Sequence, residues 1–165
     1  LDGPIHIRWG ITTARETLQI AGHAAAAIDA NTDLLIANQY YPIAGPCTEM
    51  CLLETAAQAI VDTASGREML SGSAAAKGVA MDKTTGMEAR IMGEAAIATC
   101  GKKISEINGI LEKLISSYEK NHHKPPAGKR FQECYDVKTV MPTDEYLQIY
   151  DKAVETLNGF GLAIK

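Results

Sequence analysis

The sequence predicts an α/β fold in which three strand–helix units are followed by C-terminal helices. Strand-like segments recur three times, a helical pattern follows each of them, and the last third of the chain carries mainly helical patterns. This order is typical of right-handed βαβ units on a parallel sheet. We therefore expect residues 1–101 to form the βα units and residues 102–165 to form a helical C-terminal extension of the same domain.

The first unit begins almost at the start of the chain. Apolar and polar residues alternate over Ile5–Trp9, which is the two-residue period of a strand. Thr13 and Glu16 then have the spacing of a capping box, with Thr13 as the N-cap. The helix that they begin is expected to run to about Ala30.

The second and third units follow the same pattern. The apolar run within Asp33–Asn38 predicts a strand buried on both faces. A helix is expected from Thr48, with Gly66 as its C-cap. Arg67–Ser73 is the third expected strand, and Met87–Cys100 is the helix that follows it.

The C-terminal extension contains two further expected helices. From Ser105 the apolar residues recur at helical spacing in the clearest amphipathic pattern of the chain. A proline-broken loop, His122–Gly128, is expected to be solvated, and the last helix is expected from Thr143.

Three βα units cannot close a barrel, which needs eight strands and about 250 residues. Two alternatives remain: a small open sheet, or the C-terminal part of a TIM (β/α)8 barrel whose other strands lie outside this sequence. Because the chain enters a strand almost at once, we expect the second.

The amino-acid composition and net charge argue against several classes of function. The chain has 165 residues, of which 46% are hydrophobic and 22% charged, and its net charge is −4. Nucleic acids and anionic membranes call for a basic surface, so neither is an expected partner. No apolar run approaches the ~20 residues that span a bilayer, and we expect a cytoplasmic protein. The cysteines lack disulfide or zinc spacing and are expected to be free thiols: Cys47, Cys51, Cys100 and Cys134.

Four hydrogen-bonding side chains stand where the second expected strand ends, and they are Asn38, Gln39, Tyr40 and Tyr41. In parallel sheets and barrels, active sites lie where strands end and loops begin. The alternative is a strand end that bonds to its own loop and buries two rings. Because side chains alternate along a strand, only one pair of the four can face a site.

Other candidate sites are weaker. The sequence lacks the common phosphate-binding, metalloprotease and serine-hydrolase motifs, and its histidines have no convincing metal spacing. Cys47 and Cys51 lie at a helix start, where the helix dipole lowers thiol pKa values. Their more ordinary interpretation is two small buried residues.

Several long segments carry a family resemblance: LDGPIHIRWG, NQYYPIAGPCTEMCLLE, DTASGRE, DKTTGMEAR and GKRFQECYDVKTVMPT. They resemble the C-terminal third of the monomethylamine methyltransferases of methylotrophic methanogenic archaea. The resemblance implies a TIM barrel assembled as a hexamer. It also implies transfer of the methyl group of monomethylamine to the Co(I) corrinoid of a cognate corrinoid protein, which feeds methane formation.

The resemblance also assigns roles to the strand-end residues. Gln39 and Tyr41 match the family positions that line the ring of pyrrolysine, the reactive residue, which lies upstream of the segment that this chain resembles. Asn38 and Tyr40 would then be the supporting pair. The corrinoid is expected on the partner protein, because the chain lacks a DxHxxG segment. We expect no cofactor or metal bound by this chain itself.

A non-catalytic alternative stays open. The segment alone lacks the pyrrolysine and most of a barrel, so we expect it to be inactive when isolated. It could then serve only as a structural or oligomer contact, or as a module that binds the corrinoid protein.

Overall fold

The computed structural model describes residues 3–164. Its α-helices are α1 (Arg15–Asn31), α2 (Glu49–Ala64), α3 (Gly86–Thr99), α4 (Ile104–Tyr118), α5 (Phe131–Cys134) and α6 (Asp144–Phe160). Its strands are β1 (Ala37–Tyr40), β2 (Met69–Ser73), β3 (Tyr135–Asp136) and β4 (Met141–Pro142). Two 3-10 helices complete the described elements, η1 (Ala76–Gly78) and η2 (Glu119–His123).

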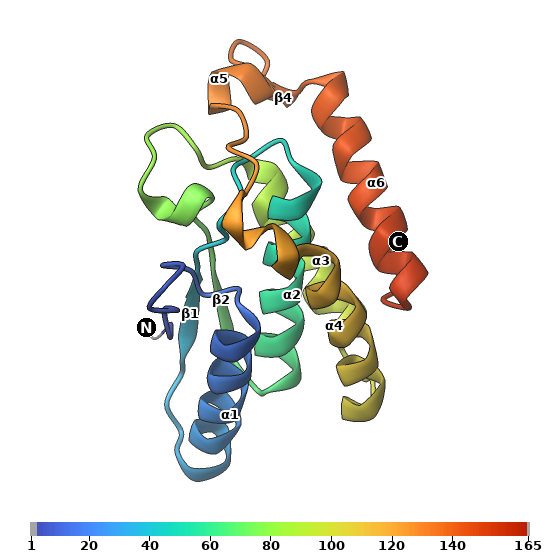
Figure 1. The fold of residues 1–165 in the computed structure, drawn as a ribbon. Coiled ribbons are helices and arrows are strands. Elements are labelled where there is room, and N and C mark those ends of the chain that lie inside the picture. The colour runs from blue at the N-terminus through green and yellow to red at the C-terminus, as the bar shows by residue number, and fades with distance from the viewer. Residues whose placement is uncertain (1–2, 165) are drawn as a thin grey trace.

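Helix α2 is the centre of the molecule. It packs against α1, α3, α4 and α6, and it also contacts both strands of the β1–β2 sheet (Figure 1). Most of the residues of α2 are apolar, and most of its side chains are buried. The largest apolar side chains of the core come from the surrounding helices as well as from α2: Leu18, Leu52, Ile60, Ile91, Leu114 and Leu157.

The parallel arrangement predicted from the element order is confirmed for β1 and β2. Ala37 pairs with Met69, Asn38 with Leu70, and Tyr40 with Ser73. The register is irregular between Asn38 and Tyr40, so Gln39 has no partner residue on β2. The helices between and after these strands, α2 and α3, lie close to their predicted bounds.

The predicted strand at Ile5–Trp9 is wrong, so the described chain holds two βα units on a parallel sheet where three were expected. The imidazole of His6 accepts hydrogen bonds from the backbone N–H groups of Arg8 and Trp9, which closes the segment into a turn. Gly10, at φ +67°, then donates to the His6 carbonyl oxygen (2.7 Å). A local side-chain acceptor thus competes successfully with an extended backbone.

Two further expectations at the start of the chain need correction. The N-cap of α1 is Ala14 and not Thr13, because the buried Thr13 hydroxyl donates to Glu54 of α2 (2.6 Å). The second strand begins at Ala37 rather than near Asp33, and Leu34 and Leu35 before it are exposed.

The C-terminal helices agree better with prediction. Helix α4 begins one residue before Ser105, and Thr143 caps α6 by accepting a hydrogen bond from the Tyr146 N–H. Two features were not expected: the short antiparallel pair β3–β4, and the burial of His122 at the end of η2.

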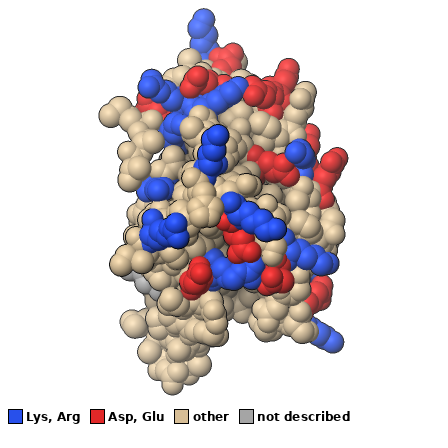
Figure 2. Space-filling view, viewed as in Figure 1, with Lys and Arg blue, Asp and Glu red and all other residues tan. Residues whose placement is uncertain are grey.

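In Figure 2, charges of both signs are interspersed over the upper and middle parts of the face, whereas its lower left part shows mainly uncharged residues. No helix within residues 3–164 is long and apolar enough to cross a membrane.

Candidate functional site

The four strand-end residues divide into two pairs, as alternation along a strand requires. Asn38 and Tyr40 are fully buried at 0% exposure, whereas Gln39 and Tyr41 are half-buried. Gln39, and Tyr41 just after the strand, therefore lie on the side of β1 that α2 does not cover. Within residues 3–164, neither the Gln39 side-chain amide nor the Tyr41 hydroxyl has a hydrogen-bond partner, so both groups are able to bond to a ligand.

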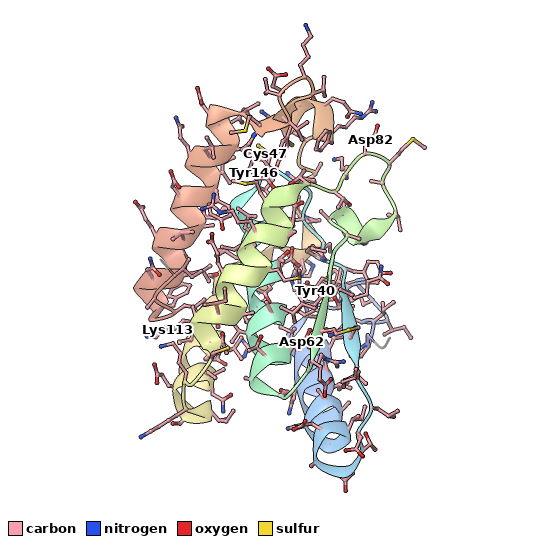
Figure 3. The ribbon with its side chains drawn as sticks, turned by 180° about the vertical axis from the view of Figure 1, so that it is seen from behind. Tyr40, Cys47, Asp62, Asp82, Lys113 and Tyr146 are labelled. Atoms are coloured by element: carbon pink, nitrogen blue, oxygen red, sulfur yellow. The ribbon has the colours of Figure 1, made fainter. Side chains whose placement is uncertain are left out.

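The buried pair faces α2. The Asn38 amide donates to Asp62 Oδ1 (3.2 Å), which also accepts from Arg67 Nε (2.8 Å). Tyr40 lies in the same layer, between the strand and α2 (Figure 3). Burial and the neighbouring Asp62 carboxylate raise the pKa of Tyr40, so it stays a neutral phenol.

The half-buried pair, Gln39 and Tyr41, is held through its backbone. Gln58 of α2 donates from Nε2 to the Gln39 carbonyl oxygen (3.2 Å). The Tyr41 N–H donates to the Thr12 hydroxyl (2.9 Å), and that hydroxyl donates to Gln58 Oε1 (2.6 Å). The Thr12 N–H returns a hydrogen bond to the Tyr41 carbonyl oxygen (3.3 Å).

The loop after β1 is fixed by Glu54, which is one helical turn before Gln58. Its two carboxyl oxygens accept from the Ile43 N–H (3.1 Å) and the Ala44 N–H (3.0 Å), and one of them also accepts from Thr13. Burial raises the pKa of Glu54 to about 7, although these hydrogen bonds oppose the shift.

The segment after β2 forms a second wall beside Tyr41. Backbone N–H groups at 74, 76 and 77 donate to the carbonyl oxygens of Tyr40, Ala44 and Pro42. Gly78 has φ +68°, and a Cβ built there would lie 2.8 Å from the Tyr41 ring. A side chain at position 78 would therefore displace that ring.

The pattern analysis missed the three buried polar residues of α2 that hold this strand end: Glu54, Gln58 and Asp62. A signal for them exists in the sequence. They recur every four residues in a mostly apolar helix, and this spacing places them on one face. Polar residues at such positions are expected to be hydrogen-bonded inside the protein.

The ordinary interpretation of the first two cysteines is supported. Cys47 and Cys51 are buried, and burial raises the pKa of both thiols rather than leaving them activated. No cluster of three or more His, Cys, Asp or Glu residues suited to a metal ion occurs within residues 3–164.

Comparison with known proteins identifies the family. The family model described as monomethylamine methyltransferase MtmB matches residues 1–162. Monomethylamine methyltransferase MtmB2 of Methanosarcina barkeri is 68% identical over 162 residues, which are 98% of this chain and 35% of that protein. The chain belongs to the monomethylamine methyltransferase family.

Further members of the family are similar to this chain in sequence and in structure. MtmB of Methanosarcina mazei is 66% identical over the same share of each chain. The crystal structure of the Methanosarcina barkeri monomethylamine methyltransferase superposes with a TM-score of 0.97 at 68% identity, again over 98% of this chain and 35% of that one. A second similar structure is a hydroxylamine complex of MtmB, also with a TM-score of 0.97. The chain thus spans about a third of the length of these methyltransferases.

Proposed function

We propose that this chain is the C-terminal part of a TIM-barrel methyltransferase that moves the methyl group of monomethylamine to the Co(I) corrinoid of a partner protein. Family membership supports the reaction class and the amine substrate. The observation that carries the site assignment is the alternation at the end of β1, which turns Gln39 and Tyr41 away from α2 while Asn38 and Tyr40 face it.

The proposed roles follow from the chemistry of the two side chains. Gln39 offers an amide that both donates and accepts hydrogen bonds, and Tyr41 offers a phenol that does the same. The two groups can hold an amine nitrogen in one orientation, and neither adds a charge to the site.

Pyrrolysine, from the part of the family's chain that precedes this segment, would supply an electrophile for the amine, and the partner's corrinoid would supply the methyl acceptor. The described residues fit such neighbours. Gln39 and Tyr41 keep their polar ends unpaired, whereas Gln58 and Thr12 hold their backbones. The contribution of this chain is orientation of the bound amine, which can supply several kcal/mol of barrier lowering when the reacting atoms are aligned (up to about 7–11 kcal/mol in the best cases).

The test uses the full-length enzyme and single-turnover methyl transfer. Gln39→Ala and Tyr41→Phe should each slow the transfer by roughly 10-fold to 1000-fold, because each removes one positioned hydrogen bond. Neither change should lower the melting temperature, since both side chains are only half-buried.

Two control variants belong with this test. Asn38→Ala should act mainly on stability, because Asn38 bonds to the buried Asp62. Tyr150→Phe removes a hydroxyl that bonds to Glu94 on α3, away from β1, and should leave the rate unchanged. If Gln39→Ala left the rate intact while Asn38→Ala abolished it without loss of stability, the assignment of the two faces would be inverted.

We further propose that the rest of the barrel, the pyrrolysine and the oligomer contacts come from the remainder of the full-length protein, which assembles as a homo-oligomer, a hexamer in the family, and acts in the cytoplasm. The isolated segment should then show no methyl transfer from methylamine to a Co(I) corrinoid protein. Activity of residues 1–165 alone would contradict this proposal.

A further inference from the structure

Helix α2 carries one row of buried polar side chains that lies alongside β1 and the loop after it. We call Glu54, Gln58 and Asp62 the α2 polar stripe. All three are at 0% exposure, and their four-residue spacing places them on one face of the helix. Most neighbouring positions on α2 are apolar; Thr55, which is also buried, bonds to Cys51 and Ser73 and not to β1.

Each member of the stripe bonds to a successive part of the strand end. Asp62 accepts from the Asn38 side chain, Gln58 donates to the Gln39 carbonyl oxygen, and Glu54 accepts from the N–H groups at 43 and 44. The helix therefore contacts the strand through hydrogen bonds along the whole stretch that contains the proposed site.

At Gln39 the position of the backbone is not fixed by strand pairing. The β1–β2 register is interrupted between Asn38 and Tyr40, so no residue of β2 is paired with Gln39. An irregularity of this kind re-aims side chains and removes ladder hydrogen bonds locally. At this position the backbone is bonded to α2, through Gln58, instead of to a paired residue of the neighbouring strand.

We propose that Gln58 and Thr12 are positioning residues that set the orientation of Gln39 and Tyr41 in the methyl-transfer site. This inference rests on the proposed function of the Gln39–Tyr41 pair. Gln58 uses one end of its amide on the Gln39 carbonyl and the other on the Thr12 hydroxyl, which accepts from the Tyr41 N–H. One side chain of α2 is thereby linked to the backbones of both proposed site residues.

The residue types suit this role. Gln58 donates to a carbonyl oxygen and accepts from a hydroxyl, and its amide carries the donor and the acceptor on two separate atoms. Thr12 needs a group that donates and accepts at once, which a hydroxyl does. Both side chains are buried, and loss of either would remove the side-chain partner of a backbone group in a half-buried residue, Gln39 or Tyr41.

The first experiment measures the strand itself in the full-length enzyme. Thr12→Val keeps the side-chain shape and removes the acceptor of the Tyr41 N–H. Hydrogen–deuterium exchange of that amide should accelerate about 10-fold or more. Thr12→Ser keeps the hydroxyl and should restore slow exchange. Thr99→Val is the matched control, because it removes a buried hydroxyl that bonds only to its own helix. Unchanged exchange at Tyr41 in Thr12→Val would overturn the proposal.

The second experiment asks whether this orientation matters for catalysis. Thr12→Val and Gln58→Leu should each slow single-turnover transfer at saturating methylamine by roughly 10-fold to 100-fold, as a misplaced group does. Thr99→Val should leave the rate unchanged. In a Gln39→Ala, Tyr41→Phe background, the same two changes should cost less than about 3-fold, because positioning has no group left to act upon.

The outcomes separate this inference from the proposed function. An equal loss of rate in both backgrounds would show that Thr12 and Gln58 act through something other than the site pair, and would overturn the inference. If Gln39→Ala and Tyr41→Phe had no effect on the rate, the proposed function of the pair would be wrong. The inference about catalysis would fall with it, while the exchange of the Tyr41 amide would still report whether Thr12 holds the strand.

Discussion

Residues 11–101 and residues 102–165 bury different kinds of side chain. Apart from tyrosines, the buried polar and charged side chains of the described chain lie almost entirely in the first region, and His122 is the exception. The second region contributes mainly apolar side chains from α4 and α6, such as Ile110, Leu114 and Leu157. Its buried tyrosines face the first region, where Tyr118 donates to the Thr13 carbonyl and Tyr150 to Glu94.

This difference indicates which part of the molecule needs its backbone and side chains held at fixed distances and angles. Apolar packing is stabilising but not directional, and it tolerates adjustment. Buried hydrogen bonds fix distances and angles, and they are costly when left incomplete. The region with the proposed site is held mainly by buried hydrogen bonds. The second region, whose helices α4 and α6 pack on α2, is held mainly by burial of apolar surface.

The largest expected loss of unfolding free energy comes from removing a buried charge in the first region. Asp62→Ala removes the carboxylate that Arg67 contacts at 2.8 Å, and both side chains are at 0% exposure. Breaking a buried pair by removing one partner costs about 3–5 kcal/mol of unfolding free energy. Urea unfolding of the full-length protein measures the loss. Glu106→Ala, which breaks a pair between the exposed Glu106 of α4 and Lys102 just before that helix, should cost less than about 0.5 kcal/mol. Equal losses for the two variants would remove the contrast between the regions.

The second test addresses the apolar region. Leu157→Ala empties a fully buried position on α6 and should lower the unfolding free energy by about 2–5 kcal/mol. Because Leu157 makes no hydrogen bond to β1, the rate of methyl transfer by the folded enzyme should stay within about 2-fold of the parent rate, a change worth roughly 0.4 kcal/mol. A large loss of rate at temperatures where the variant is folded would show that α6 also positions the site.

The helices of the second region were predictable from sequence because their signals are local. The apolar residues of α4 recur at helical spacing, and the Thr143 cap marks the start of α6. Thr48 was recognised as the start of α2 for the same reason, and its side chain does accept from the Cys51 N–H. The division of Asn38 to Tyr41 into two pairs also follows from strand geometry alone.

The remaining features depend on contacts between distant residues. Ile5–Trp9 has a strand-like pattern, but the His6 imidazole bonds to its own segment. Thr13 has the spacing of a cap, yet its hydroxyl bonds to Glu54, 41 residues later. The role of Gln58 is equally non-local, since its partners Thr12 and Gln39 lie in other elements. Spacing along the chain does not encode these partners.

The third prediction concerns pH and Glu54. Its pKa is raised from about 4.5 to about 7 in the folded protein by burial. The folded state therefore binds the proton more tightly than the unfolded state, so this contribution to stability is full below pH 4.5 and is lost as the pH rises through 7. Between pH 5 and pH 7.5 the loss should be about 2 kcal/mol.

Unfolding curves of the parent and of Glu54→Gln across this pH range measure the effect. The amide does not titrate, so the variant should have a flatter profile by about that amount, whatever its absolute stability. A matched variant, Glu145→Gln, alters an exposed carboxyl on α6 and should leave the profile as it is. An unchanged slope in Glu54→Gln would show that Glu54 is ionised at both ends of the range.

The smallest expected effect concerns the ion pairs that join the two regions. Arg15 of α1 contacts Glu112 of α4 at 2.5 Å and Glu119 of η2 at 3.0 Å, and its side chain is 36% exposed. Because water and salt screen such pairs, Arg15→Met should cost at most about 1 kcal/mol, and less at high salt. Lys102→Met, which breaks a pair with Glu106 four residues later within the second region, is the matched control and should cost about 0.3–0.5 kcal/mol. A loss above about 2 kcal/mol that persists in 1 M salt would exceed what exposed pairs supply. The boundary between the regions would then be held by directional contacts rather than by the apolar packing of α4 against α2.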